Sequence, residues 1–80
     1  MLVQTANSVY EVHESEQVYR LVGHDPGNGL RALSDWLHYD RLGPVRTGEP
    51  LRIFVVREES GRVLNYRVVT TSPVTGVLAA

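Results

Sequence analysis

Apolar and polar residues alternate along much of the chain, a pattern that predicts strands rather than helices. Five segments combine this alternation with β-branched or aromatic residues and are separated by turn-forming residues. They are residues 2–5, 8–13, 18–23, 51–58 and 62–71. A short sixth strand is predicted over residues 74–78, bent away after Pro73, because proline has no N–H to donate to a sheet. The predicted fold class is mainly β, a small antiparallel β-barrel or roll of five to six strands.

Residues 2–23 are predicted to form a three-stranded meander with its first turn at Ala6-Asn7. An even-length loop over residues 14–17 sets Glu11 opposite Arg20, a cross-strand ion pair worth roughly a few tenths of a kcal/mol. The same register aligns the apolar residues of the opposite face, Tyr10 with Leu21 and Val12 with Tyr19.

A hairpin over residues 51–71 is the clearest unit of the sequence. Its turn is expected at residues 59–62, with Gly61 supplying a positive φ. An even-length loop pairs Val55 with Tyr66 and gathers most polar residues on the opposite face, as a half-buried sheet requires. A three-residue loop with a glycine bulge would shift the pairing by one residue and place Arg52 and Arg67 on opposite faces, and we prefer the even loop.

In the even register, the polar face of this hairpin carries a candidate binding surface made of Arg52, Phe54, Asn65 and Arg67. Guanidinium groups beside an aromatic ring can bind phosphates and stack on bases. The alternative is that Phe54 packs beneath another segment while the arginines pair with carboxylates, and the near-neutral charge of the chain favours this alternative.

The middle of the chain, residues 23–50, allows two interpretations. A glycine-rich loop over residues 23–29 is followed by a segment that is either helical over residues 30–42 or a strand over residues 36–42. Helical spacing aligns more of the apolar residues, with Asn28 as a cap. We therefore expect one short helical or irregular insertion near residues 28–42.

The chain has 80 residues and a mass of 8.9 kDa, which predicts a single domain over residues 1–80. One core of this size supplies only a few kcal/mol, and a chain without cysteine has no disulfides to add to it. Association with another chain is therefore a physical expectation. The predicted core consists of Val3, Tyr10, Val12, Tyr19, Leu21, Leu33, Trp36, Leu37, Ile53, Val55, Leu64, Tyr66 and Val68.

Composition excludes several kinds of chemistry. All eight basic residues are arginine, so lysine Schiff bases and lysine-containing phosphate loops are absent, as are thiolate nucleophiles and cysteine-bound zinc. The net charge of -1 argues against bulk attraction to nucleic acid or acidic membranes. With no apolar run of about 20 residues and no signal-peptide pattern at the N-terminus, we expect a cytoplasmic protein without membrane contact.

Candidate catalytic groups are few. His24-Asp25 lies in the glycine-rich loop, and His38 stands two residues before Asp40, but neither pair has the further residues that a hydrolase or a metal site requires. No serine has the neighbours of a nucleophile elbow. We therefore expect no catalytic residue, no metal, no cofactor and no enzymatic activity.

Two short motifs carry a resemblance. The stretch T-x-x-S-x-Y-E from Thr5 to Glu11 and the stretch T-S-P-V from Thr71 to Val74 resemble those of a loose class of small actinobacterial and actinophage β proteins. They cover roughly a seventh of the chain. The resemblance implies an intracellular accessory protein, phage-encoded, and transfers no functional residue.

The function predicted first is that of a small non-enzymatic interaction module. It would bind another protein or self-associate as a homo-oligomer through a β edge or an apolar face, since an unpaired edge is either protected or used. The alternative is an accessory nucleic-acid-binding protein that uses Arg52, Phe54 and Arg67 on one face of a sheet.

Overall fold

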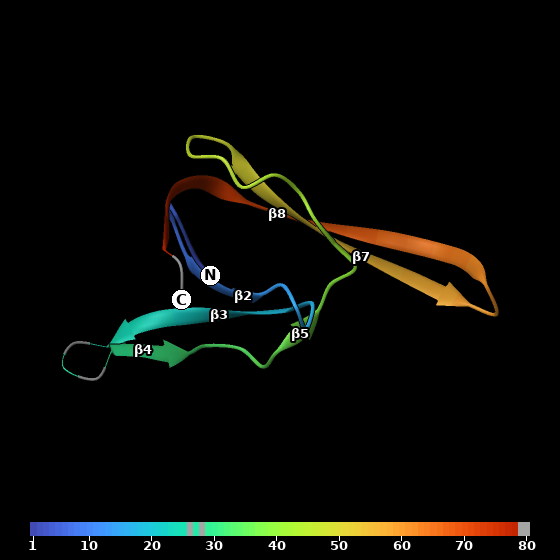
Figure 1. The fold of residues 1–80 in the computed structure, drawn as a ribbon, viewed down its shortest axis with the longest axis horizontal. Coiled ribbons are helices and arrows are strands. Elements are labelled where there is room, and N and C mark those ends of the chain that lie inside the picture. Colours follow the sequence, from blue (N-terminus) through green and yellow to red (C-terminus); the bar gives the residue numbers. More distant parts are fainter. Residues whose placement is uncertain (26, 28, 79–80) are drawn as a thin grey trace.

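The structure is a computed structural model that describes the backbone of residues 1–25, 27 and 29–78. The structure does not describe the side chains of residues 24–25, 57–59 and 63–64. Leu64 of the predicted core is therefore outside the described part. The described residues form an all-β fold without a helix (Figure 1). Its strands are β1 Leu2–Thr5, β2 Val9–His13, β3 Val18–Asp25, β4 Gly29–Ala32, β5 Leu37–His38, β6 Arg41–Leu42, β7 Pro50–Glu59 and β8 Arg62–Leu78.

The strands form one antiparallel sheet in the order β4-β3-β2-β1-β8-β7-β6, and β5 pairs with β3 beside that path. The mainly β, antiparallel prediction is confirmed, but the sheet is not closed into a barrel. Residues 74–78 pair with β1 as the bent continuation of the long strand β8. Within the described residues, no helix is long and apolar enough to cross a membrane.

The helical form of the insertion expected near residues 28–42 is wrong, while the segment is irregular and includes short strands within residues 36–42. Its described residues form the short strands β4, β5 and β6 (Figure 1), and the proposed cap Asn28 lies outside the described residues. Tertiary hydrogen bonds explain the difference, since Tyr39 N–H donates to Gln17 C=O at 3.0 Å and Asp40 N–H donates to Phe54 C=O at 2.9 Å. These bonds hold the backbone extended, and a local apolar pattern cannot report them.

The core lies where the meander, the base of the β7–β8 hairpin and the 39–45 segment meet. It consists of Val3, Val12, Tyr19, Tyr39, Leu51, Ile53 and Val74. The prediction is confirmed for Val3, Val12, Tyr19 and Ile53, while Tyr10, Leu21 and Val55 are half-buried.

Five predicted core residues are exposed instead. Leu33, Trp36 and Leu37 follow or form the outer edge strands, which no further strand covers among the described residues. Tyr66 and Val68 lie on the outer part of the β7–β8 hairpin, beyond the core. The first error follows from the helical spacing assumed for the 30–42 segment, which forms short strands instead. The second arises because alternation reports which residues share a face but not whether another layer covers that face.

The meander register is confirmed in full. Tyr10 pairs with Leu21 and Val12 with Tyr19. Glu11 faces Arg20 with 2.7 Å between the carboxylate Oε1 and the guanidinium Nε. The even number of residues in this short loop therefore determines which residues of β2 and β3 pair.

The hairpin turn is also confirmed, but the predicted pairing beyond it is wrong. Ser60 and Gly61 have φ values of 53° and 76°, and Glu59 pairs with Arg62 as expected for a two-residue turn. A β-bulge between Arg57 and Glu58 then shifts the register by one residue, so that Val55 faces Arg67 rather than Tyr66.

Buried threonines fix the corner where β8 bends from β7 to β1. The Thr71 hydroxyl accepts the Leu51 N–H at 3.0 Å and donates to Ser72 C=O at 2.7 Å. The Ser72 hydroxyl donates to Thr5 Oγ1 at 2.8 Å, and Thr5 Oγ1 in turn accepts the Ser8 N–H at 3.0 Å. The two motifs that carry the resemblance therefore meet at one hydrogen-bonded corner.

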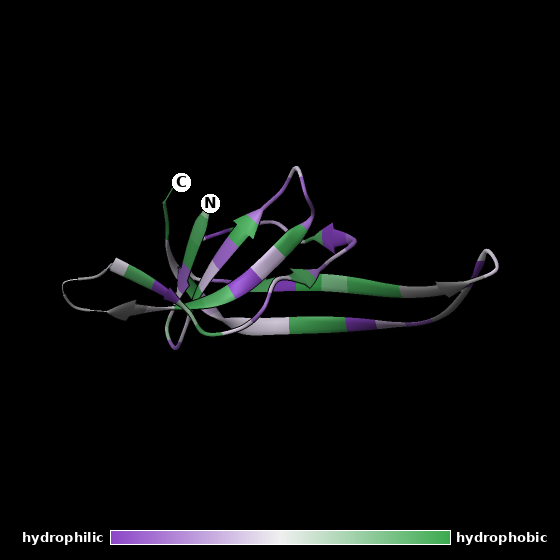
Figure 2. Ribbon diagram, turned by 90° about the horizontal axis from the view of Figure 1, so that it is seen from below, coloured by the Kyte–Doolittle hydropathy of each residue, from purple (hydrophilic) through white to green (hydrophobic). Residues whose placement is uncertain are grey.

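The outer half of the β7–β8 hairpin extends beyond the rest of the molecule (Figures 1 and 2). We call residues 55–68 the arm, since pairing with β6 ends at Phe54. The molecule measures 47 × 25 × 20 Å, and its radius of gyration is 13.5 Å. A compact chain of this length has a radius of gyration of about 12 Å, so the arm gives the protein an elongated shape.

Thr71→Val tests the buried corner. The substitution keeps the shape of the side chain but leaves the Leu51 N–H buried without an acceptor, and we expect it to lower the free energy of unfolding by about 1–3 kcal/mol. Urea denaturation measures the difference. Thr70→Val on the exposed neighbouring residue is the control and should change the stability by less than about 0.5 kcal/mol; equal effects of the two variants would contradict the assigned role.

Candidate functional site

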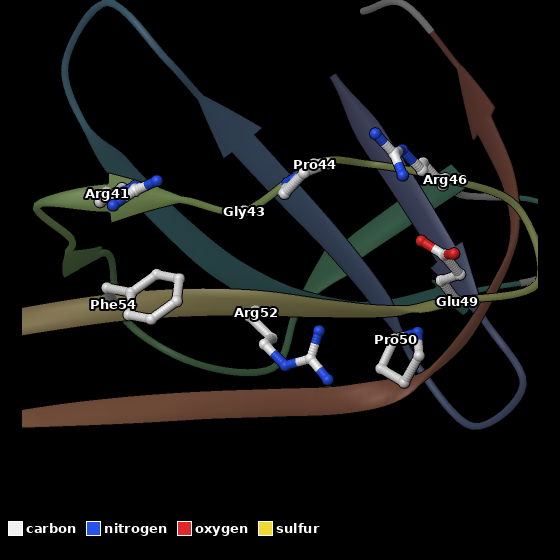
Figure 3. Close-up of a pocket in the computed structure, with 8 residues that line it drawn as sticks. All are labelled: Arg41, Gly43, Pro44, Arg46, Glu49, Pro50, Arg52 and Phe54. Atoms are coloured by element: carbon white, nitrogen blue, oxygen red, sulfur yellow. The ribbon is translucent and has the colours of Figure 1, made fainter.

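A hollow of about 310 Å³ lies where the 41–50 segment crosses the start of β7 (Figure 3). Its position depends on β6, whose Arg41 pairs with Phe54 and whose Leu42 pairs with Ile53. We call it the arginine hollow. It is lined by Arg41, Gly43, Pro44, Arg46, Glu49, Pro50, Arg52 and Phe54.

Close backbone packing holds the two sides of the hollow together. Gly43 N–H donates to Arg52 C=O at 2.8 Å, and a Cβ atom at Gly43 would lie 3.2 Å from that oxygen. Glycine therefore fits here with less crowding than any other residue. At the far end, Gly48 N–H donates to Val74 C=O at 2.8 Å, and Val74 N–H donates to Glu49 C=O at 2.9 Å. The 43–49 connection is thus fixed at both ends.

Positive charge dominates the lining of the hollow. Arg41, Arg46 and Arg52 are exposed, and Glu49 is the acidic residue among the lining side chains. The Arg41 guanidinium lies 5.8 Å from the centroid of the Phe54 ring, a cation–π contact. Among the side chains that the structure describes, no carboxylate lies within ion-pair distance of these three arginines. The hollow therefore presents a local charge of +2 on a chain whose net charge is -1.

The structure separates the four residues predicted as a binding surface. Arg52 and Phe54 line the arginine hollow. Asn65 and Arg67 lie on the opposite face of the hairpin, because the β-bulge pairs Arg67 with Val55 and Asn65 with Arg57. The predicted sharing of one face by Arg52 and Arg67 is therefore wrong.

Arg67 lies instead on the face that continues toward the core. Burial raises the pKa of Tyr19, and the positive charge of Arg67 partly opposes that rise. Sequence reasoning missed Arg41 and Arg46 because they belong to the segment expected to be an insertion. The pairing of β6 with β7 places Arg41 opposite Phe54, and the local pattern of apolar and polar residues does not predict that pairing.

A second polar cluster covers the outer face of β2 and β3. Glu11 holds Arg20 with Oε1 and contacts His13 Nε2 with Oε2 at 3.2 Å. The Arg20 guanidinium lies 4.2 Å from the centroid of the Trp36 ring, and the His13 ring meets Trp36 edge-on at 4.8 Å. Partial burial alone would raise the pKa of Glu11, but hydrogen bonds and charges from Arg20 and His13 hold it below its ordinary value. These contacts fasten Trp36 against the sheet.

The structure describes the side chains of one of the two histidine–carboxylate pairs, His38 and Asp40. The backbone of His24 and Asp25 belongs to the β3–β4 ladder, opposite Leu30 and Gly29, while their side chains lie outside the described part. His38 Nε2 lies 3.3 Å from one oxygen of Asp40, whose other oxygen binds a backbone N–H. Within the described residues, no group of three or more metal-ligating side chains comes together.

Asp40 protects the edge of β7 immediately before β6 begins. Its Oδ2 accepts the Val56 N–H at 2.6 Å. This hydrogen bond, with a further contribution from His38, lowers the pKa of Asp40 below its ordinary value. A depressed carboxyl pKa stabilises the folded state above the ordinary pKa, and the contribution is lost as the pH falls through the folded value.

Asp40→Asn tests this interaction. The variant loses the charge-assisted bond to Val56, so we expect it to melt at a lower temperature than the unmodified protein at about pH 7. The difference should disappear at about pH 2, where the native carboxyl is protonated as well. Thermal melting followed by circular dichroism measures both conditions. Asp35→Asn removes the same charge from an exposed position and should show no comparable pH-dependent difference.

Comparison of the chain with protein-family models, with curated proteins and with solved structures returns no match.

Proposed function

We propose that this protein is a small non-enzymatic β module that self-associates through the free edge of β8 along the arm. The observation that carries the proposal is an unpaired stretch of main chain on that edge. A two-stranded ribbon is marginally stable in water, whereas three or more strands with an apolar face support one another. The arm therefore gains most from an added strand.

Hydrogen-bond parity shows which groups of β7 point outward. The C=O groups of Arg52 and Phe54 accept bonds from the β6 segment, so residues of this parity face away from β8. In an antiparallel strand, the N–H and C=O of one residue point the same way. Ile53 and Val55 therefore direct their main-chain groups toward β8.

The partners of those residues on β8 define the free edge. Ile53 pairs with Val69, and the alternation places the main-chain groups of Tyr66, Val68 and Thr70 on the side away from β7. On that side, β1 pairs with β8 only from Val74 onward, among the described residues. Residues 65–70 thus form an open edge about 20 Å long.

The two edges of the arm differ in protection. On β7, the Asp40 carboxylate occupies the Val56 N–H immediately beyond β6. On β8, residues 65–70 contain no proline, and Arg67 is their one charged residue. Strand addition is therefore expected at β8.

The surface area of the chain matches a second copy as the partner. The accessible surface is 5568 Å². A compact protein of this mass exposes about 4,800 Å², so each chain carries an excess of about 750 Å². If two chains buried this excess against each other, the interface would cover about 1,500 Å², within the usual range for a specific interface. Figure 2 shows apolar residues on both strands of the hairpin that supplies this surface.

Of the registers centred on Tyr66 and on Arg67, only the first keeps the arginines of the two edges from lying directly opposite one another. Pairing β8 with its copy about Tyr66 sets Asn65 opposite Arg67 and the two tyrosines opposite one another. Pairing about Arg67 would set two arginines directly opposite, which is destabilising. We therefore place the two-fold axis at Tyr66.

Tyr66→Cys tests the register on a chain that has no native cysteine. Paired residues in an antiparallel ladder have Cα atoms about 5.5 Å apart, within the range that a disulfide spans. We expect mild oxidation to convert the variant to a covalent dimer, seen by non-reducing electrophoresis. Leu78→Cys is the matched control, since the side chains of Tyr66 and Leu78 are 69% and 65% exposed on the same strand. Equal cross-linking of both variants would contradict the register.

Val68→Pro tests the edge itself. It removes an N–H that points away from β7, so the hairpin keeps its internal bonds while strand addition is blocked. Light scattering should show a dimer for the unmodified protein and a monomer for the variant, with unchanged circular dichroism. A monomeric unmodified protein at high concentration would overturn self-association and leave a different protein as the partner of the edge.

A further inference from the structure

The arginine hollow gathers positive charge that no carboxylate among the described side chains neutralises by an ion pair. Three of the eight arginines line it, with Glu49 as the acidic lining residue. Like charges held near one another oppose folding, and a bound anion removes that cost. The net charge of -1 for the whole chain hides this local excess.

The three guanidinium groups are spread along the hollow rather than gathered at one point (Figure 3). Arg41 and Arg46 are five positions apart on an extended segment, a distance of about 16 Å along the backbone. Arg52 lies between them across the hollow, since its C=O accepts the Gly43 N–H. This spacing suits an anion with several charges along its length.

An aromatic ring stands at one end of this row of cations. Phe54 is half-buried, lines the hollow and lies beside the Arg41 guanidinium. A positively charged groove with an aromatic ring is the combination by which proteins bind single strands without sequence preference. The carboxylates of an acidic peptide would pair with the arginines but offer no aromatic face to stack on Phe54.

We propose that the arginine hollow binds a short stretch of single-stranded nucleic acid. Arg41, Arg46 and Arg52 contact successive phosphates, and one base packs against Phe54. The site is built from residues of a single chain, so it does not depend on the pairing of two arms. Glu49 lies at the end of the hollow near Arg46 and repels phosphate, so the phosphate contacts are made by the three arginines alone.

Fluorescence anisotropy with a labelled oligothymidylate of about 12 nucleotides measures this binding across a range of salt concentrations. Three phosphate contacts predict that log K falls against log salt with a slope of about -2. Each of Arg46→Gln and Arg52→Gln should reduce that slope by about 0.7. Phe54→Leu should weaken binding about 10-fold, through the loss of one stacked base.

Arg31→Gln is the matched control, because Arg31 is an exposed arginine of β4 outside the hollow. It should leave the slope unchanged. Absence of salt-dependent binding, or an equal loss in Arg31→Gln and Arg52→Gln, would overturn the proposal. Equally tight binding of a polyglutamate peptide would overturn the assignment to nucleic acid. Retention of binding in Val68→Pro is expected and separates this site from self-association.

Discussion

The position of two consecutive residues, Tyr39 and Asp40, governs much of this structure. Their N–H groups donate to the C=O groups of Gln17 in the β2–β3 turn and of Phe54 in β7. The Tyr39 ring is buried, with its centroid 6.3 Å from that of Tyr19, so the same crossing that links the two parts also covers the core. Without the hydrogen bonds of Tyr39 and Asp40, the 41–42 segment would not be held beside β7, and the arginine hollow would not form.

A second constraint acts where β8 changes partner. Proline at position 73 cannot donate to a ladder, and the preceding hydroxyls supply bonds that the bent backbone lacks. Thr71 satisfies Leu51 from within the core, while Ser72 ties the bend to Thr5. The polar residues of this corner are therefore required by its geometry, and they allow one strand to serve both the meander and the arm.

The sequence predicted the structure well where pairing is local. The Glu11–Arg20 register followed from one short loop, and the Ser60-Gly61 turn was likewise readable from its residues. The β-bulge that follows this turn leaves no mark in the alternation, and it carried Arg67 away from Arg52. Arg52 and Phe54 of the candidate site were found from the sequence because they share one strand. Arg41 was missed because it reaches them only through the pairing of β6 with β7.

The small size of the domain explains why its two surfaces lie where they do. Among the described residues, a core of seven lies beneath the base of the hairpin rather than the arm, and the proposed strand addition would support the arm instead. Asp40 favours β8 as the edge for this proposed pairing, because its carboxylate accepts the Val56 N–H on the other edge, that of β7. In the proposed dimer, the strand added at β8 is separated from the arginine hollow by the width of the hairpin. Because the Asp40 carboxylate directs that strand to β8 rather than β7, the hollow stays accessible in the dimer.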